Sequence, residues 1–471
     1  MKIVTIKSIL LFLTILFLAF SFSIQVMTFS PLPALAPYVL LASVFLLTLY
    51  QRPSSFKLRW SPHHRITFLI ILYLVSLFFN TGWQTIFSFI NLYQGVSAIF
   101  VFGLPVMFFV YFRSFATNQE FRAVFSAMLL AGLVSGSFYV YDSYSMMVQG
   151  QVSEYNISVM KYIEMRSLWE GPQNVARITP FGRSHGLLEK HTVSAAWIVL
   201  GCFGALTLLP KRKPIKRMTI VLIFSLILLI ALNVTSIALF VFVVLLMEYR
   251  GHSILYGAPS KRIVNLLLTI ITGLVLVGSL YYLLPDSIGV HLGASIVKIM
   301  DYQVDLVSGN LKHVEHSYFG SLIRSFISYP DDVSKIFPLG VLIGDGFSTF
   351  GFSKGGDYGI VESLHRFGVP LFFAILIGLM SLIRCAFKQI YRKGQKQSPE
   401  INYLWFAGSA TLYIVLADVH YSIWCMKSIL PIIFINLAIF DRYLYSPTQR
   451  RLLRHSQLIR SPMSHYNKIK S

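Results

Sequence analysis

Two stretches of the chain gather the arginine, histidine and carboxylate side chains that could do chemistry. In chain order they are Arg177, Arg183, His185 and His191 in the first stretch, and Arg324, Asp357, Glu362 and Arg366 in the second. Arginine carries a planar, permanently charged fork that binds phosphate oxygens through two parallel hydrogen bonds. A carboxylate within hydrogen-bond reach of a hydroxyl group can accept its proton. These residue types could therefore bind an anionic group and take up a proton.

The elements that must position these residues are membrane helices. Of the 471 residues, 55% are hydrophobic and 13% are charged, and the mean hydropathy is +0.66. Soluble domains carry about 25% charged residues, so this composition excludes a water-soluble globular protein. The three cysteines lie in or beside apolar stretches without a C-x-x-C pattern, which excludes a disulfide framework and a zinc finger.

Twelve apolar stretches predict twelve transmembrane helices, because a helical span needs about 20 apolar residues. They are 8–29, 31–50, 66–80, 92–112, 123–141, 192–209, 218–233, 235–249, 263–284, 360–383, 401–417 and 424–440. The polar residues 233–236 divide the long run at 218–249 into two short spans. The first stretch is longer than the apolar core of a signal peptide, which is about 7–15 residues, so we interpret it as a span.

The distribution of charge predicts the orientation of the chain. With the N-terminus in the cytoplasm, the inner segments hold 28 of the 40 Lys and Arg residues and only four of the 19 acidic residues. The positive-inside rule therefore favours twelve spans with both termini cytoplasmic. Residues 1–440 form one transmembrane domain in this interpretation, and residues 441–471 form a basic tail that contacts anionic lipid. Nucleic-acid binding is the weaker interpretation of the basic tail, because no base-stacking motif accompanies its charges.

Two predicted outer segments, 142–191 and 285–359, are too long to be simple connections. Loops beyond about 15 residues are usually functional or disordered, and the mixed composition of these two argues against disorder. We expect them to contain short helices. The predicted spans carry almost no ionisable residue at mid-depth, which argues against an ion-coupled transporter. The sequence therefore predicts that function lies on the extracytoplasmic face.

The motifs of the two outer loops, in this order, resemble the superfamily of bacterial O-antigen ligases and O-antigen and exopolysaccharide polymerases. Arg183-x-x-Gly186 before an apolar span is similar to the arginine motif of that family's first loop. Arg324 after Gly320-Ser321 is similar to the arginine motif of the second loop, and is followed by the turns Pro338-Leu339-Gly340 and Gly344-x-Gly346. The resemblance covers roughly residues 66–440 by the order of the elements.

Two positions depart from the ligase branch of the superfamily. Thr235-Ser236 is similar to a signature in which an arginine commonly follows, and Ile237 stands there instead. In the ligases a His-Asn pair opens the motif that ends here in Gly368, whereas this chain has Asp357-Tyr358-Gly359. The resemblance is therefore greater to the polymerase branch.

The resemblance implies a glycosyltransferase of the bacterial inner membrane that polymerises oligosaccharide repeat units carried on polyprenyl pyrophosphate. Arg183 and Arg324 would hold the pyrophosphate, and Asp357 or Glu362 would accept the proton of the incoming sugar hydroxyl. Four further residues would bind substrate: Arg177, His185, His191 and Arg366. Pyrophosphate is a good leaving group, so neither a metal ion nor a cofactor is implied. The expected partners are the lipid-linked donor, a glycan acceptor and membrane lipid; a chain-length regulator and a flippase of the same pathway are candidates.

Each candidate residue also has a simpler structural interpretation. Arg183 and Arg324 could pair with acidic residues of the loops. Asp357 could serve as a helix N-cap, and Glu362 and Arg366 are spaced i,i+4 as in a helix-surface ion pair. The two histidines of the first stretch could form interfacial hydrogen bonds, and His313 and His316 do not have the spacing of a standard metal site.

Three other functions remain as alternatives. A ligase would transfer the lipid-linked glycan to lipid A core or another acceptor. A polysaccharide or lipid-linked sugar flippase should have similar halves and polar residues deep in its spans, and neither is evident. A non-enzymatic assembly partner would leave the two loop arginines unexplained.

Overall fold

The computed structural model is mostly helical in the residues that it describes, with turns and short links between the helices, and no strand occurs in those residues. The described residues are 3–30, 32–51, 64–86, 92–148, 153–170, 186–188, 191–209, 214–230, 234–249, 325–330, 340–344, 359–393, 399–419 and 426–444. The first helices are α1 (Ile3–Thr28), η1 (Leu32–Leu35), α2 (Ala36–Gln51), α3 (His64–Ile86), α4 (Leu92–Gly103), α5 (Val106–Ser114), α6 (Asn118–Val148) and α7 (Glu154–Glu170). They are followed by α8 (His191–Leu208), α9 (Pro214–Ile230), α10 (Val234–Tyr249), α15 (Gly340–Ile343), α16 (Gly359–Phe367), α17 (Val369–Lys393), α18 (Pro399–Ala417) and α19 (Leu430–Tyr443).

Six segments in the described part of the chain are long and apolar enough to cross a membrane, which confirms the predicted class of helical membrane protein. They are Thr5–Thr28, Leu32–Gln51, Arg65–Ile86, Asn118–Asp142, His191–Leu208 and Val369–Tyr391. Ala98–Ser114 and Thr235–Leu246 form shorter apolar helical segments. Such stretches are helical because a helix satisfies its own backbone hydrogen bonds where no water is present.

Two predicted spans are not single helices in the structure. The span at 92–112 is divided by a turn at Leu104 and Pro105, because proline has no backbone N–H with which to continue the helix. The span at 360–383 is divided at Gly368 into α16 and α17. The long run at 218–249 contains the two helices α9 and α10; residues 234–236 of the predicted break belong to α10, and residues 231–233 lie outside the described residues. The predicted span at 263–284 lies outside the described residues.

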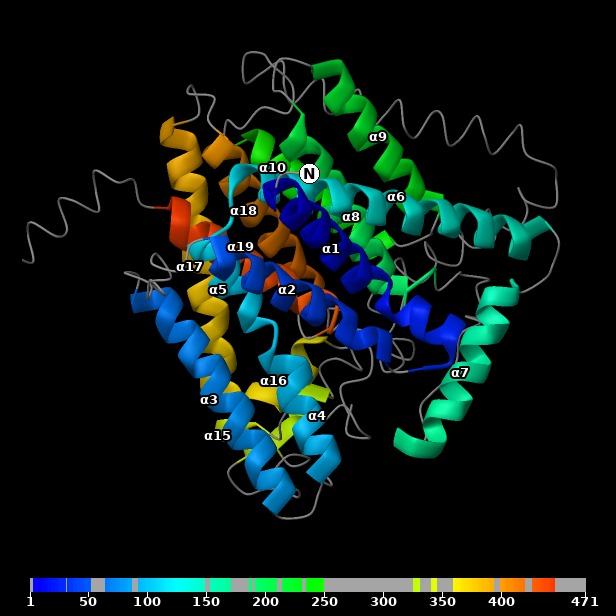
Figure 1. Ribbon diagram of the computed structural model, residues 1–471, viewed down its shortest axis with the longest axis vertical. Helices are drawn as coiled ribbons and strands as arrows, with labels where there is room; N and C mark the ends of the chain where they lie inside the picture. Colours follow the sequence, from blue (N-terminus) through cyan, green and yellow to red (C-terminus); the bar gives the residue numbers. More distant parts are fainter. Residues whose placement is uncertain are drawn as a thin grey trace, which may run out of the picture.

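Helix α8 forms the centre of the bundle. All its residues from Thr192 to Thr207 are buried, and it contacts α6, α9, α10 and α18 (Figure 1). The side chain of Trp197 is fully buried there, and Phe203 packs edge-on against Trp405 of α18 with ring centroids 5.6 Å apart. A helix that is apolar on all sides is stable only when other helices or lipid surround it, which explains this central position.

A close backbone contact joins α6 to α8 through glycines. A Cβ atom added to Gly132 of α6 would lie 2.9 Å from the Cα atom of Gly201 and 2.9 Å from the carbonyl oxygen of Trp197. A Cβ atom on Gly204 would lie 2.9 Å from the carbonyl oxygen of Phe125. Small residues spaced along a helix allow two backbones to approach in this way. The contact fixes α6 and α8 relative to each other.

A buried ion pair joins the beginnings of α1 and α6. The ammonium group of Lys7 lies 3.2 Å from a carboxylate oxygen of Glu120, and both side chains are buried. The second carboxylate oxygen of Glu120 accepts a hydrogen bond of 2.6 Å from the backbone N–H of Thr117, whose hydroxyl accepts one of 3.3 Å from the N–H of Glu120. This reciprocal pair is a capping box, and it satisfies two backbone donors at the start of α6.

A second ion pair closes the same end of the bundle. Arg113, in the last turn of α5, donates to the carboxylate of Asp441 near the end of α19, and both side chains are almost fully buried. The neighbouring Arg442 donates to the carbonyl oxygens of Phe112 and Ala116. The carbonyls at the end of a helix lack partners within the helix, so these bonds satisfy them and hold α5 against α19.

The glycine contact yields the first prediction. Gly132→Ala and Gly201→Ala are each expected to lower the free energy of unfolding by about 1–3 kcal/mol, because the new methyl group meets backbone atoms that cannot rotate away. Unfolding of the purified chain in detergent micelles measures this effect. Gly82→Ala in α3 is the matched control, because an added Cβ there has nothing within 4 Å, and it should not destabilise the chain. Wild-type stability of both α6 and α8 variants would contradict the close contact.

Candidate functional site

The break between α16 and α17 lies at Gly368, the last residue of the motif that begins at Asp357. Gly368 adopts a φ of +71°, and Gly344, at the end of α15, adopts a φ of +78°. Only glycine enters this left-handed region without strain. A Cβ atom on Gly344 would lie 2.4 Å from the carbonyl oxygen of Arg366, and one on Gly368 would lie 2.5 Å from backbone atoms of Leu342. The two glycines therefore let the end of α15 pack directly on the end of α16 (Figure 1).

Helix α16 carries two of the predicted site residues as a buried ion pair. A guanidinium nitrogen of Arg366 donates to a carboxylate oxygen of Glu362, and the two side chains are only 12% and 10% exposed. The guanidinium carbon also lies 5.8 Å from the centre of the Phe102 ring in α4. The pair suggested by the i,i+4 spacing therefore forms, but it is buried between helices rather than placed on a helix surface. Breaking such a pair on one side leaves an uncompensated buried charge.

Neighbouring helices hold this ion pair in place. The side-chain amide of Asn80, buried in α3, donates a hydrogen bond of 3.0 Å to the carbonyl oxygen of Arg366. The hydroxyl of Tyr329 donates one of 3.0 Å to the carbonyl oxygen of Leu364, and its ring packs edge-on against His365 with centroids 4.8 Å apart. The carbonyl of Arg366 lies in the last turn of α16, where the helix provides no donor. The carbonyl of Leu364 also accepts a bond of 2.7 Å from the backbone N–H of Gly368, so Tyr329 adds a second donor to it.

Asp418 is a site residue that the sequence analysis missed. It follows the last residue of α18, is buried, and accepts a hydrogen bond of 2.8 Å from the hydroxyl of Ser363. Ser363 is adjacent to Glu362, so the bond brings a second carboxylate to α16. Asp418 is separated from Ser363 by 55 positions, and it lies at the edge of an apolar run, where a polar residue resembles ordinary helix termination. Only its proximity to α16 indicates a role.

Residues 186–188, at the end of the arginine motif of the first loop, contact α1, α6 and α7. Gly186 has a φ of +71°, and a Cβ atom there would lie 2.7 Å from the hydroxyl oxygen of Ser194. The carbonyl oxygen of Leu187 accepts hydrogen bonds from the hydroxyls of Ser23 in α1 and Tyr155 in α7. The backbone N–H of Leu188 donates a bond of 3.2 Å to the hydroxyl of Ser194. Residues 186–188 are therefore held in place just before α8 begins.

Three predicted site residues belong to the described part of the chain. Glu362 and Arg366 form the pair on α16, and His191 is the first residue of α8, where its carbonyl oxygen accepts a hydrogen bond of 2.6 Å from the hydroxyl of Tyr139. The other predicted residues lie outside the described residues: Arg177, Arg183, His185, Arg324 and Asp357. Ser236, in the signature Thr235-Ser236, accepts a hydrogen bond of 3.1 Å from the hydroxyl of Tyr413 in α18.

An apolar pocket lies beside the ion pair. It is an open groove of about 480 Å³, the adjoining open space included, between α3, α16, α17 and α19. Tyr73 and Phe367 line the end nearest the pair, and Tyr73 donates a hydrogen bond of 2.8 Å to the carbonyl oxygen of Phe102. An apolar groove next to a guanidinium and two carboxylates suits an amphiphile with a charged head. The carboxylates could accept a proton, whereas the charge of Arg366 is already matched by Glu362.

A metal site is not part of this arrangement in the described residues, which contain no group of three or more His, Cys, Asp or Glu residues able to hold an ion. The two cysteines among them, Cys202 and Cys385, are free thiols. No protein-family model matches the chain, and no curated protein matches it.

The buried pair yields the second prediction. Glu362→Gln and Arg366→Gln are each expected to destabilise the chain by about 3–5 kcal/mol, because each leaves one buried charge without its partner. The double variant removes both charges and should recover most of the loss, so the interaction energy from a double-mutant cycle should be large. Unfolding in detergent micelles measures all three variants. Glu154→Gln, at an exposed position of α7, is the control and should change stability by less than about 0.5 kcal/mol. Additive effects of the two single substitutions would contradict a coupled pair.

Proposed function

We propose that the chain is a membrane glycosyltransferase that polymerises polyprenyl-pyrophosphate-linked oligosaccharide repeat units on the outer face of the cytoplasmic membrane. The observation that carries the proposal is the packing of Gly344 against the carbonyl of Arg366. This contact joins the turns that follow Arg324 to the motif that ends in Gly368. In the family that the sequence resembles, these two segments are separate motifs. The buried Glu362–Arg366 pair lies at this junction.

The reaction requires the bond between the anomeric carbon and the pyrophosphate oxygen to break. A new bond then forms between that carbon and a hydroxyl oxygen of the second glycan, whose proton passes to a carboxylate. Arg183 and Arg324 bind the departing pyrophosphate and stabilise the charge that develops on it. Asp357 accepts the proton, with Glu362 as the second candidate. Arg366 holds the carboxylate of Glu362 in position.

The apolar pocket beside Phe367 supports a lipid-linked substrate. Its walls are aliphatic and aromatic side chains of four helices, which suit an isoprenoid chain rather than a sugar. Phe102 links this pocket to the charged residues of α16, because its carbonyl accepts a hydrogen bond from Tyr73 of the pocket and its ring lies 5.8 Å from the guanidinium carbon of Arg366. A substrate bound across both would place its apolar chain in the pocket and its anionic head beside the guanidinium.

The proposed topology has twelve spans with both termini in the cytoplasm. The described contacts support it, because Lys7, Glu120, Arg113 and Asp441 meet at one end of the bundle and belong to segments expected in the cytoplasm. Ser23 and Leu187, which are expected at the outer side, also meet each other.

Reporter fusions test this orientation and provide the third prediction. Fusions after residues 60, 214, 255, 392 and 460 should report the cytoplasm, because these positions fall in the basic segments. Fusions after residues 160 and 320 should report the outside. A cytoplasmic signal at 320 would contradict both the topology and an outer active face.

Assay of polymer formation tests the proposed function and provides the fourth prediction. Arg183→Lys and Arg324→Lys should each reduce polymer by at least about 100-fold, because lysine presents a point charge without the two-pronged geometry. Arg122→Lys, at an exposed position of α6, is the matched control and should retain activity. The substrate is the purified lipid-linked repeat unit, and the product is measured by chain length.

Two results of the same assay would change the proposal. Full activity of both arginine variants would reduce these residues to ion pairs of the loops. Transfer of a completed glycan to a lipid A core acceptor, without any growth of the chain on the carrier lipid, would assign the ligase reaction instead.

A further inference from the structure

The last turns of α3 contain two polar side chains that are buried without a hydrogen-bond partner. Thr81 is 2% exposed and Gln84 is 4% exposed. Within the part of the chain that the structure describes, neither the hydroxyl of Thr81 nor the amide oxygen of Gln84 is hydrogen-bonded. A buried polar group without a partner costs free energy, and such groups commonly bind a water molecule or a ligand. These two groups are therefore candidates for contact with a molecule outside the chain.

The same part of α3 contacts the predicted site on α16. The amide of Asn80 donates a hydrogen bond of 3.0 Å to the carbonyl oxygen of Arg366, so this face of α3 lies against α16 (Figure 1). Residues three or four positions apart share a helix face, so Gln84 is adjacent both to Thr81 and to Asn80. Gln84 lies about 6 Å along the helix axis from Asn80. In the proposed topology this is the outer end of α3.

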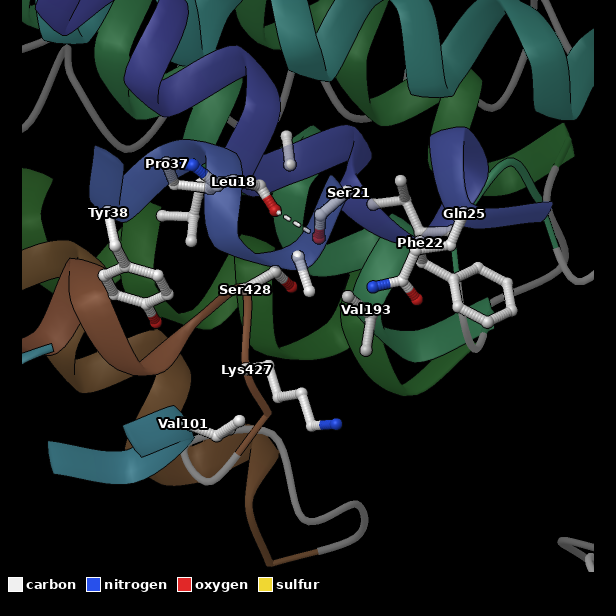
Figure 2. Close-up of a pocket in the computed structure, with 13 residues that line it drawn as sticks. Leu18, Ser21, Phe22, Gln25, Pro37, Tyr38, Val101, Val193, Lys427 and Ser428 are labelled. Atoms are coloured by element: carbon white, nitrogen blue, oxygen red, sulfur yellow. Dashed lines mark hydrogen bonds between the residues drawn. The ribbon is translucent and has the colours of Figure 1, made fainter. Parts of the chain in front are cut away.

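A second pocket of the bundle differs from the end of α3 in how its polar groups are used. It has about 620 Å³, the adjoining open space included, and is lined by parts of α1, α2, α4, α8 and the segment before α19 (Figure 2). Leu188 is one of its lining residues. The amide oxygen of Gln25 accepts a hydrogen bond of 3.4 Å from Tyr162, and Gln25 and Lys427 both have further contacts within the protein. The protein itself therefore uses these polar groups.

The chemistry of the two groups on α3 favours a neutral ligand with hydroxyl groups. The amide oxygen of Gln84 can only accept a hydrogen bond, whereas the hydroxyl of Thr81 can both donate and accept. An oxygen that only accepts is repelled by the oxygens of a phosphate or a carboxylate, and it needs an O–H or N–H donor. Neighbouring hydroxyl groups of a sugar ring supply a donor for Gln84 and a second partner for Thr81. A sugar therefore fits these groups, and an anion does not.

We propose that Thr81 and Gln84 bind hydroxyl groups of the glycan that the lipid substrate carries. This inference rests on the proposed function, which supplies the glycan. It assigns the sugar to the end of α3 and leaves the pyrophosphate to the arginines. A site that binds a substrate hydroxyl discriminates against a ligand without it, because the polar groups of the site then remain buried and unpaired. The two residues should therefore produce a preference for glycosylated over bare carrier lipid.

Binding of two lipids to the purified full-length chain in neutral detergent tests this proposal. The probes are the lipid-linked repeat unit and the same polyprenyl pyrophosphate without sugar, and native mass spectrometry measures both. The wild type should bind the glycosylated lipid at least about tenfold more tightly. Thr81→Val and Gln84→Met keep the size of each side chain but remove its polar group, so each should reduce this preference at least about threefold. Binding of the bare lipid should not change.

Matched variants separate the loss of these polar groups from a general disturbance of α3. Thr85→Val removes a hydroxyl that donates a hydrogen bond of 2.8 Å to the carbonyl oxygen of Thr81 within the helix, and it should bind both lipids like the wild type. Thr81→Ser keeps the hydroxyl and should keep the preference. In lipid-free detergent, Thr81→Val and Gln84→Met should unfold at or above the wild-type temperature, because each removes a buried group without a partner.

The outcomes distinguish this inference from the proposed function. Wild-type preference in both Thr81→Val and Gln84→Met would overturn the glycan site, since the two groups would then hold only water. Lower unfolding temperatures of both lipid-free variants would also overturn it, because the groups would then have partners within the protein. Polymer formation by a wild type that shows no preference would overturn the site and leave the proposed function standing. A preference that depends on both residues, in a chain that forms no polymer, would support the site and overturn the proposed function.

Discussion

The close contact between the backbones of α6 and α8 is the constraint on which the rest of the structure depends. Gly132 and Gly201 lie face to face, and no larger residue fits between the two helices. This contact places Tyr139 of α6 at the first residue of α8, where its hydroxyl binds the carbonyl of His191. It also places Ser194 beneath Gly186. The end of the first motif is therefore positioned by helix packing and not by the loop that precedes it.

Polar contacts are concentrated at the ends of the helices, and the two ends differ. At one end, buried ion pairs join α1 to α6 and α5 to α19. Their partners are the few acidic residues in segments that are otherwise basic, and each pair is satisfied within the protein. At the other end lie the glycine junction of α15 and α16, the residues 186–188 and the pocket beside them. One end is thus suited to holding helices together and the other to contacting ligands.

The two pockets differ in their polar groups. One is lined by aliphatic and aromatic side chains and includes Phe367, which follows Arg366 in the chain. The other contains Gln25 and Lys427 within apolar walls, and both of these side chains have partners in the protein. Helix α4 contributes Val101 to the second pocket, while its Phe102 contacts Arg366 and Tyr73.

The sequence by itself determined the class of fold, because long apolar runs leave the helix as the simplest way to satisfy backbone groups in a membrane. It also identified Glu362 and Arg366 as an i,i+4 pair, since that relation is local. Only the tertiary structure decided that this pair is buried, that Asp418 and Asn80 reach α16, and that Gly344 packs on Arg366. These contacts join residues far apart in the chain. They depend on how closely helices approach, and local hydrophobic pattern does not encode that distance.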